Sequence, residues 1–97
     1  MSGGDWKDMF RGVETNDLEL VKYYVLKGID INYQHPEFLT GPLFEAIRLE
    51  RIEMIEYLLE QGADLNTPEG FGGPNAYALA KKLGNRQIIA LLDKAKK

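Results

Sequence analysis

The most regular hydrophobic pattern in the chain lies in the segment from Leu43 to Asn66, LFEAIRLERIEMIEYLLEQGADLN. Apolar residues recur three or four positions apart in two short runs, which is the spacing of one face of an α-helix. Charged residues occupy the other faces. The pattern therefore predicts two amphipathic helices joined by a short turn. The apolar positions are Leu43, Ala46 and Ile47 in the first run and Met54, Ile55, Leu58 and Leu59 in the second.

Glycine residues mark where the predicted helices end. Gly62 follows the second apolar run, Gly28 follows an earlier run, and Gly84 separates two later ones. A glycine at such a position commonly closes a helix in the left-handed conformation. No segment alternates at a period of two residues for long enough to predict a strand, so the connectors are expected to be turns and loops. The connectors contain Pro36, Pro42, Pro68 and Pro74.

Short polar residues mark where two of the helices begin. Asn16 or Asp17 is expected to cap the helix that follows, and Asn16 and Glu19 have the spacing of a capping box. Asn85 is expected to cap the last helix, because it stands directly after Gly84 and before an apolar run.

The chain repeats itself with a period of 34 residues. A shift by this period aligns Gly28–Asn32 (GIDIN) with Gly62–Asn66 (GADLN), and a second shift aligns Leu58 with Leu92. So many agreements are improbable by chance, and an internal period of this length is typical of a repeat architecture. Three units are therefore predicted, at about 5–34, 35–68 and 69–97.

The units resemble ankyrin repeats, whose pattern runs G-x-T-P-L-H-x-A-A and ends in G-A-D-V-N. The middle unit offers GPLFEA from Gly41 and GADLN from Gly62, and the third offers ALAKKLGN from Ala78. The resemblance implies an all-α helical repeat solenoid, with three helix-turn-helix units and finger loops between them. It also implies a protein–protein interaction module without catalysis.

The sequence departs from the ankyrin pattern in two ways. Its units are 34 residues apart where 33 is usual, and the extra residue falls in each connecting finger, after Asn32 and after Asn66. The histidine of the T-P-L-H motif is also replaced, and His35 lies in a finger instead. The replacing residues are Phe10, Phe44 and Ala78.

A chain of 97 residues without a sizeable linker predicts a single domain over residues 1–97, with Met1 to Gly4 as a mobile start. Helices of about nine residues are too short to be stable alone, so each unit has to bury its apolar face against the next unit. The outward faces of the end units are accordingly expected to be polar. Asp8 stands where Pro42 stands in the middle unit, and Asp93 stands where Leu59 stands.

The net charge of −3 hides a strong asymmetry along the chain. The first unit carries six acidic and four basic residues, the second seven and two, and the third two and six. The basic tail ends in Lys94, Lys96 and Lys97, where lysines complement the dipole of a C-terminal helix. A lysine cluster can bind phosphates, but the dipole accounts for these lysines, so we do not expect nucleic acid as a partner.

The composition offers little material for catalysis or for a cofactor. The sequence contains no cysteine and one histidine, which is poor material for a metal site, and the lack of disulfides fits a cytoplasmic protein. The glycine-rich segment Gly70–Pro74 lacks the lysine of a phosphate-binding loop. No apolar run is long enough to span a membrane. We therefore expect no enzyme activity, no cofactor and no metal.

Charged residues on the predicted helices are expected to be structural. The period places Arg11 above Glu45 in one column, which predicts an ion pair between the first two units. Glu53, Glu56 and Glu60 recur on one side of an outer helix and are expected to face solvent.

The predicted function depends on the surface that the stacked units form, a concave groove bordered by the fingers. Aromatic residues at the fingers are candidates for binding hot spots, although they can instead pack on the neighbouring fingers or helices. The alternative function is a self-associating structural repeat protein, in which the acidic middle of one copy meets the basic third unit of another. The chain is thus expected to be a monomer or to associate weakly. The predicted partner-binding residues are Trp6, Tyr33, His35, Phe38, Arg48, Phe71 and Lys82.

Overall fold

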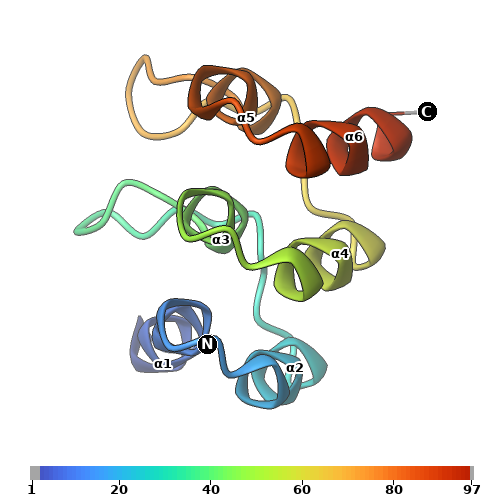
Figure 1. Cartoon of the computed structure of the whole chain (residues 1–97). Coiled ribbons are helices and arrows are strands. Elements are labelled where there is room, and N and C mark those ends of the chain that lie inside the picture. The colour runs from blue at the N-terminus through green and yellow to red at the C-terminus, as the bar shows by residue number, and fades with distance from the viewer. Residues whose placement is uncertain (1–2, 97) are drawn as a thin grey trace.

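The computed structural model describes residues 3–96, which form six α-helices and, within that range, no strand (Figure 1). This confirms the all-α fold class. The predicted mobile start lies outside the described residues at Met1 and Ser2. For Gly3 and Gly4, which begin the first helix, it stays a prediction. The helices are α1 (Gly3–Glu14), α2 (Leu18–Leu26), α3 (Pro42–Arg48), α4 (Ile52–Glu60), α5 (Ala76–Leu83) and α6 (Arg86–Ala95).

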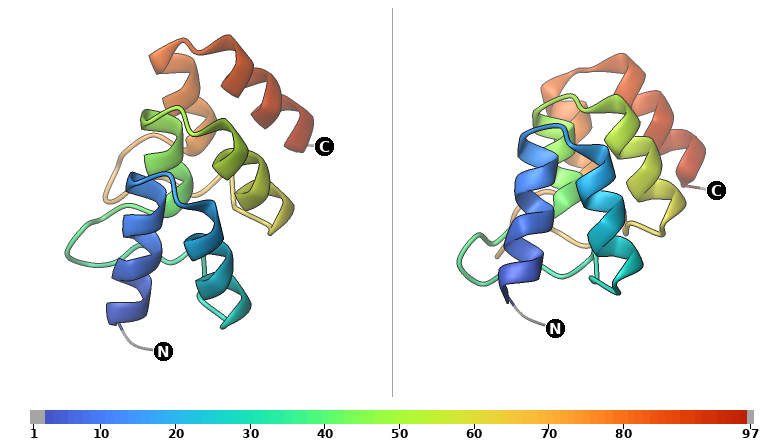
Figure 2. Two further views of the ribbon diagram at one scale, coloured as in Figure 1. Left: turned by 60° about the horizontal axis from the view of Figure 1, so that its bottom comes forward. Right: turned by 90° about the horizontal axis from the view of Figure 1, so that it is seen from below.

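The helices form three antiparallel pairs that stack in the order of the chain (Figures 1 and 2). Helices α1, α3 and α5 make an inner row in which each contacts the next, and α2, α4 and α6 make an outer row. Two loops, residues 33–41 and 67–75, project from the inner row and are called here the first and second fingers. The expected unit boundaries at 34/35 and 68/69 fall within these fingers and stay predictions.

Side-chain caps start three of the helices. The carboxylate of Asp17 accepts a hydrogen bond from the Leu20 N–H at 3.1 Å, and Asn85 accepts one from the Ile88 N–H at 3.1 Å. Asn75, which the sequence did not single out, caps α5 in the same way. The prediction of Asn16 as a cap was wrong, because Asn16 adopts a left-handed backbone with φ 59° in the turn between α1 and α2.

The predicted helix ends are confirmed by the backbone conformation. Gly28 and Gly62 follow α2 and α4 with φ values of 105° and 91°, and Gly84 closes α5 with φ 80°. These values lie in the left-handed region, where a residue with a Cβ atom is strained. The glycines therefore fix the points at which the chain leaves the outer row for each finger and leaves α5 for α6.

A continuous core runs through all three helix pairs. Each pair contributes apolar side chains from both of its helices, and the middle pair has neighbours on both sides. Leu59 was expected to belong to this core but is only half-buried, because it borders an open hollow between α4 and α6. The fully buried residues of the core include Met9, Val13, Val21, Ala46, Met54, Ile55, Leu58, Ala76, Ala80 and Leu92.

The two end faces of the stack carry tyrosines where the middle unit carries leucines. Tyr24 stands at the position of Leu58, and its hydroxyl donates to the Asp8 carboxylate at 3.2 Å. Tyr77 stands at the position of Leu43. Its hydrogen bond with Asp93 raises the pKa of the Tyr77 phenol. The aspartates predicted to face outward thus hold the phenol groups that close the stack at both ends.

Glu45 does not form the predicted ion pair with Arg11 among the described residues. Burial raises the pKa of the Glu45 carboxyl, and Glu14 raises it further. Glu14 lies about one turn beyond Arg11 on α1, and it is this α1 residue that acts on Glu45. Arg11 is exposed, and Arg48 is the cation that acts on Glu45.

Candidate binding surface on the fingers

The first finger is anchored on α1 by a cluster of four aromatic rings. Trp6 stacks on Phe10 with ring centroids 4.9 Å apart, and the edge of Phe38 meets both of these rings at 5.4 Å. The ring of His35 lies 5.2 Å from Trp6. The indole N–H of Trp6 also donates to the carbonyl of Tyr33 at 3.1 Å. Ring packing and one hydrogen bond therefore fix the finger to the inner row.

His35 holds the turn of the first finger from inside. Its carbonyl accepts hydrogen bonds from the N–H groups of Phe38 and Leu39, and its Nδ1 accepts one from the Glu37 N–H at 3.1 Å. The residue is only 8% exposed. His35 and Trp6 are among the predicted partner-binding residues, but the burial of His35 and the 2% exposure of Trp6 favour a packing role for both.

The second finger is anchored on α3 by charge. The Glu69 carboxylate accepts two hydrogen bonds from the Arg48 guanidinium, one of them at 2.6 Å, and a third from the Thr40 hydroxyl. The bonds from Arg48 are the main reason why the pKa of Glu69 is lowered, and the same pair raises the pKa of Arg48. Glu69 stands 34 residues after His35, so ions replace the aromatic anchor at the corresponding point of the second finger.

The turn of the second finger closes on the backbone of Glu69. Its N–H donates to the Pro74 carbonyl at 2.9 Å, and its carbonyl accepts from the Gly73 N–H at 3.1 Å. A Cβ atom at Gly73 would lie 2.3 Å from that carbonyl oxygen, so only glycine fits there. The short loop 70–73 is thus held at its base and presents Phe71 at its tip.

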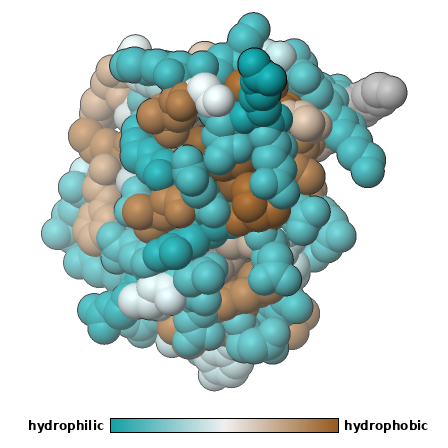
Figure 3. Space-filling model, in the orientation of Figure 1, coloured by the Kyte–Doolittle hydropathy of each residue, from teal (hydrophilic) through white to brown (hydrophobic). Residues whose placement is uncertain are grey.

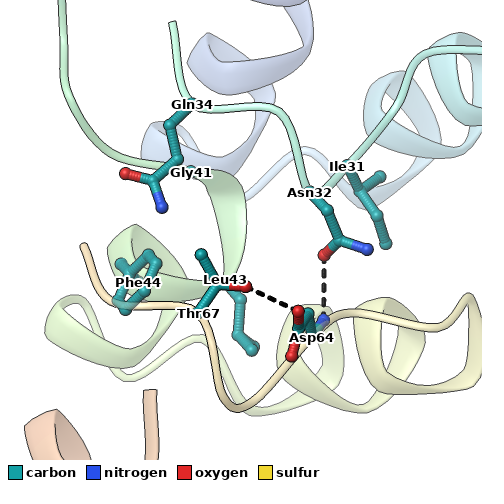
Figure 4. Close-up of a pocket in the computed structure, with 8 residues that line it drawn as sticks. All are labelled: Ile31, Asn32, Gln34, Gly41, Leu43, Phe44, Asp64 and Thr67. Carbon is teal, nitrogen blue, oxygen red and sulfur yellow. Dashed lines mark hydrogen bonds between the residues drawn. The ribbon is translucent and has the colours of Figure 1, made fainter. Parts of the chain in front are cut away.

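Side chains of the first finger tie the two fingers together. The carboxamide of Gln34 donates to the Pro68 carbonyl at 2.8 Å and accepts from the Gly70 N–H at 2.7 Å. At the base of the fingers, Asn32 Oδ1 accepts from the Asp64 N–H, and the Thr67 hydroxyl donates to the Asp64 carboxylate (Figure 4). These hydrogen bonds therefore link the first finger to the second.

An open hollow of about 580 Å³ lies between the two fingers and is called here the finger hollow. Apolar side chains are visible along the edge of the molecule from which the fingers project (Figure 3). Leu39 adopts φ 55°, a strained conformation that costs on the order of 1 kcal/mol for a residue with a side chain. The finger hollow is lined by Asp30, Asn32, Tyr33, Gln34, Pro36, Leu39, Thr67, Pro68, Gly70 and Phe71.

Apart from the buried Trp6 and His35, the predicted binding residues fall into three groups. Tyr33 and Phe71 line the finger hollow, with 49% and 93% of their surface exposed. Phe38 is 41% exposed but packs on Trp6 and Phe10, so part of its surface is structural. Arg48 is exposed, but its guanidinium is already paired with Glu69. Lys82 is exposed on α5.

Several residues of this surface escaped the sequence analysis. Gln34 links the two fingers, and Glu69 anchors the second finger on α3. Each is a lone polar residue in a loop, and no spacing rule connects it to its partner. Asp30 and Pro68 had a signal, because Asp30 lies within the repeated Gly28–Asn32 motif and Pro68 follows the second copy of that motif, at the base of each finger.

Within residues 3–96, no three carboxylate or imidazole side chains lie close enough together to hold a metal ion. Over the same range, no helix has the length and the apolar composition that crossing a bilayer requires.

Three stacked helix pairs with fingers on one side define a helical-repeat solenoid. The family model described as three copies of ankyrin repeats matches residues 9–97, and the chain belongs to the ankyrin-repeat family. Repeats of this family generally mediate protein–protein interaction.

The chain is similar to segments of several much larger proteins. It is 40% identical over 78 residues to the potassium channel AKT1 of Arabidopsis thaliana. This match covers 80% of this chain and 9% of the channel. It is 39% identical over 66 residues to the glycerophosphocholine phosphodiesterase GDE1 of Eremothecium gossypii, covering 68% of this chain and 5% of that protein. The ARF GTPase-activating protein Git of Drosophila melanogaster is 35% identical over 66 residues, covering 68% of this chain and 9% of Git. The chain thus spans less than a tenth of each of these relatives.

Proposed function

We propose that the chain is a protein-recognition module that binds a partner protein through its two fingers and the adjoining inner row, and that it performs no catalysis. The observation that carries this proposal is Phe71, which is 93% exposed at the tip of a finger anchored by ions and backbone hydrogen bonds. Covering a large solvent-exposed apolar ring with a partner lowers the free energy of the complex. Aromatic residues in such positions are favoured hot spots.

The remaining predicted residues support the proposal with different roles. Tyr33 and the exposed edge of Phe38 extend the apolar surface, while Arg48 and Lys82 provide polar contacts from α3 and α5. Trp6 and His35 support the first finger from behind and do not reach the partner themselves. Because the anchors hold the fingers in place before binding, association costs little conformational entropy.

The ionisable groups with shifted pKa values favour a structural role over catalysis. The Thr40 hydroxyl donates to Glu69, which is the arrangement of a nucleophile beside a base. However, Arg48 lowers the pKa of Glu69, and a carboxylate with a lowered pKa is a weak base. The pair therefore secures the second finger. We place the interaction in the cytoplasm, where a chain without cysteine needs no disulfides.

The proposal is tested by affinity capture from a cell extract, with the captured protein identified by mass spectrometry and then purified for calorimetry. The double variant Tyr33→Ala/Phe71→Ala is expected to weaken binding of the purified partner by more than about tenfold, because each ring is a candidate hot spot. Leu26→Ala is the matched control, since Leu26 is 85% exposed on α2 of the outer row. Equal binding by the double variant and the wild type would refute the role of the fingers.

A further inference from the structure

We propose that the finger hollow takes an extended segment of the partner protein in which an arginine stands between apolar residues. This inference rests on the proposed function and specifies the chemistry of the partner. It follows from the walls of the hollow, from its charge, and from the hydrogen bonds that its polar groups already make.

The walls of the finger hollow contain several apolar and aromatic side chains. Tyr33 and Phe71 contribute exposed rings, and Pro36 and Pro68 contribute rigid ones. Leu39, 41% exposed, adds a branched side chain. Flat ring faces suit proline and leucine side chains, and the faces of Tyr33 and Phe71 also attract a planar cation.

The charge of the hollow is negative. Among its lining residues Asp30 carries the single charge, and none is basic. One oxygen of Asp30 accepts a hydrogen bond from the Asn32 N–H at 2.9 Å, which leaves the other oxygen for an incoming cation. Asp64 is exposed at the base of the same fingers. An anionic segment is therefore disfavoured at this site, and a cationic one is favoured.

Arginine matches the aromatic faces and the negative charge of the hollow better than lysine does. Its planar guanidinium stacks on an aromatic face and can at the same time donate to a carboxylate, whereas the lysine ammonium is a compact and strongly hydrated charge. The combination of exposed rings in Tyr33 and Phe71 with the carboxylate of Asp30 thus selects a guanidinium.

The two carboxamide side chains of the hollow, Asn32 and Gln34, are already engaged. Asn32 donates to the Gly62 carbonyl and accepts from the Asp64 N–H, and Gln34 both donates to and accepts from the second finger. Residues 3–96 also contain no strand that could pair with a partner's backbone. Recognition by strand addition is therefore disfavoured, and side chains of the partner must supply the specificity.

Synthetic peptides provide the probe. A nine-residue peptide, Gly-Ser-Pro-Leu-Arg-Leu-Pro-Ser-Gly-amide, is titrated into the ¹⁵N-labelled chain and followed by NMR. Matched peptides carry citrulline, lysine or glutamate in place of the arginine, and citrulline keeps the shape of arginine without its charge. We expect saturable shifts of the amide signals of Asp30, Gly70 and Phe71. We also expect binding to weaken about fivefold with citrulline and further with glutamate.

Variants of the chain locate the site. Phe71→Ala and Asp30→Asn are each expected to weaken binding of the arginine peptide. Asp30→Asn is also expected to abolish the preference for arginine over citrulline. Leu26→Ala and Glu53→Gln are matched controls, since both residues are exposed on the outer row. Shifts confined to α1, α3 and α5, equal binding of arginine and citrulline, or no saturable shift at millimolar peptide would each overturn the inference.

The outcome is separable from that of the proposed function. If a purified partner binds and Tyr33→Ala/Phe71→Ala weakens it, but the arginine peptide does not bind, the module stands and the arginine inference fails. Shifts of the finger signals that grow with protein concentration in the absence of peptide would show that a second copy occupies the hollow, and this too would overturn the inference.

Discussion

Two carboxyl groups with pKa values shifted in opposite directions affect how the stability of this chain depends on pH. Glu69 is bound by Arg48 and Thr40, and its pKa is lowered, whereas Glu45 is partly buried beside Glu14 and its pKa is raised. A group whose pKa is lower in the folded state stabilises that state above its unfolded pKa, and this contribution is lost as the pH falls through the folded value. A group whose pKa is raised has the opposite effect. Its ionised form disfavours the folded state, and protonation removes that penalty.

Glu69→Gln is therefore expected to lower the free energy of unfolding at neutral pH by about 1–2 kcal/mol, because the charged hydrogen bonds to Arg48 are lost. The difference from the wild type should shrink as the pH falls through the lowered pKa of Glu69, because Glu69 of the wild type is then protonated as well. Urea unfolding between neutral and acidic pH measures both effects.

Glu45→Gln is the matched control, because it removes the same charge from a site where the charge is unfavourable. It should leave stability at neutral pH unchanged or slightly higher. Equal destabilisation by the two substitutions would contradict the assignment of Glu69 as the anchor of the second finger.

At the scale of elements, the helices were predictable from the sequence because their signals are local. Asp17, Asn85 and the glycines after α2 and α4 act within a few residues, and each does what its spacing predicts. The finger anchors were not predictable, since they join residues far apart in sequence. His35 was expected to contact a partner because it lies in a finger, yet it packs on Trp6 and is buried.

The two fingers should also loosen independently, because different forces anchor them. Trp6→Phe keeps a ring on Phe10 but removes the indole N–H that donates to Tyr33. We expect a loss of about 1 kcal/mol in stability, with faster amide hydrogen exchange in the first finger. The Gly73 amide of the second finger, held by Glu69, should keep its protection. Faster exchange throughout both fingers would show that the ties through Gln34 dominate instead.

Substitution of Leu58 tests the packing between neighbouring helix pairs. Leu58 is fully buried in α4, in a cluster with residues of all three pairs. Leu58→Ala is expected to cost about 2–5 kcal/mol, the range for buried leucines, and the loss should appear as a single transition in chemical denaturation. Leu59→Ala should cost less, since Leu59 is half-buried. A smaller effect at Leu58 than at Leu59 would mean that the core is not shared between the pairs as described.

At the scale of the whole molecule, the stack is closed at both ends by the same device. A phenol replaces the leucine of the middle unit and binds an aspartate, Tyr24 with Asp8 and Tyr77 with Asp93. Lysine ammonium groups lie over these rings, with Lys96 4.1 Å from the Tyr77 centroid and Lys27 5.5 Å from that of Tyr24. A polar end gains little by stacking on another copy, so the opposite charges of the second and third units support at most weak, salt-sensitive association.

Restoring the residues of the middle unit should reopen the C-terminal end. The triple substitution Tyr77→Leu/Lys81→Ile/Asp93→Leu copies Leu43, Ile47 and Leu59 onto α5 and α6, which creates an apolar face where another copy can stack. Light scattering at two protein concentrations is expected to show a monomeric wild type and a variant whose mass rises with concentration and persists in high salt.

Glu19→Leu/Glu53→Leu/Glu56→Leu controls for added hydrophobicity, because it places three leucines at exposed positions of the outer row without completing a unit's stacking face. The end-face variant should associate more strongly than this control, since only its new leucines and isoleucine reproduce positions that are complementary between neighbouring units. Equal association by the two variants would mean that exposed apolar surface alone drives the effect. The tyrosine–aspartate pairs would then have no special role in ending the stack.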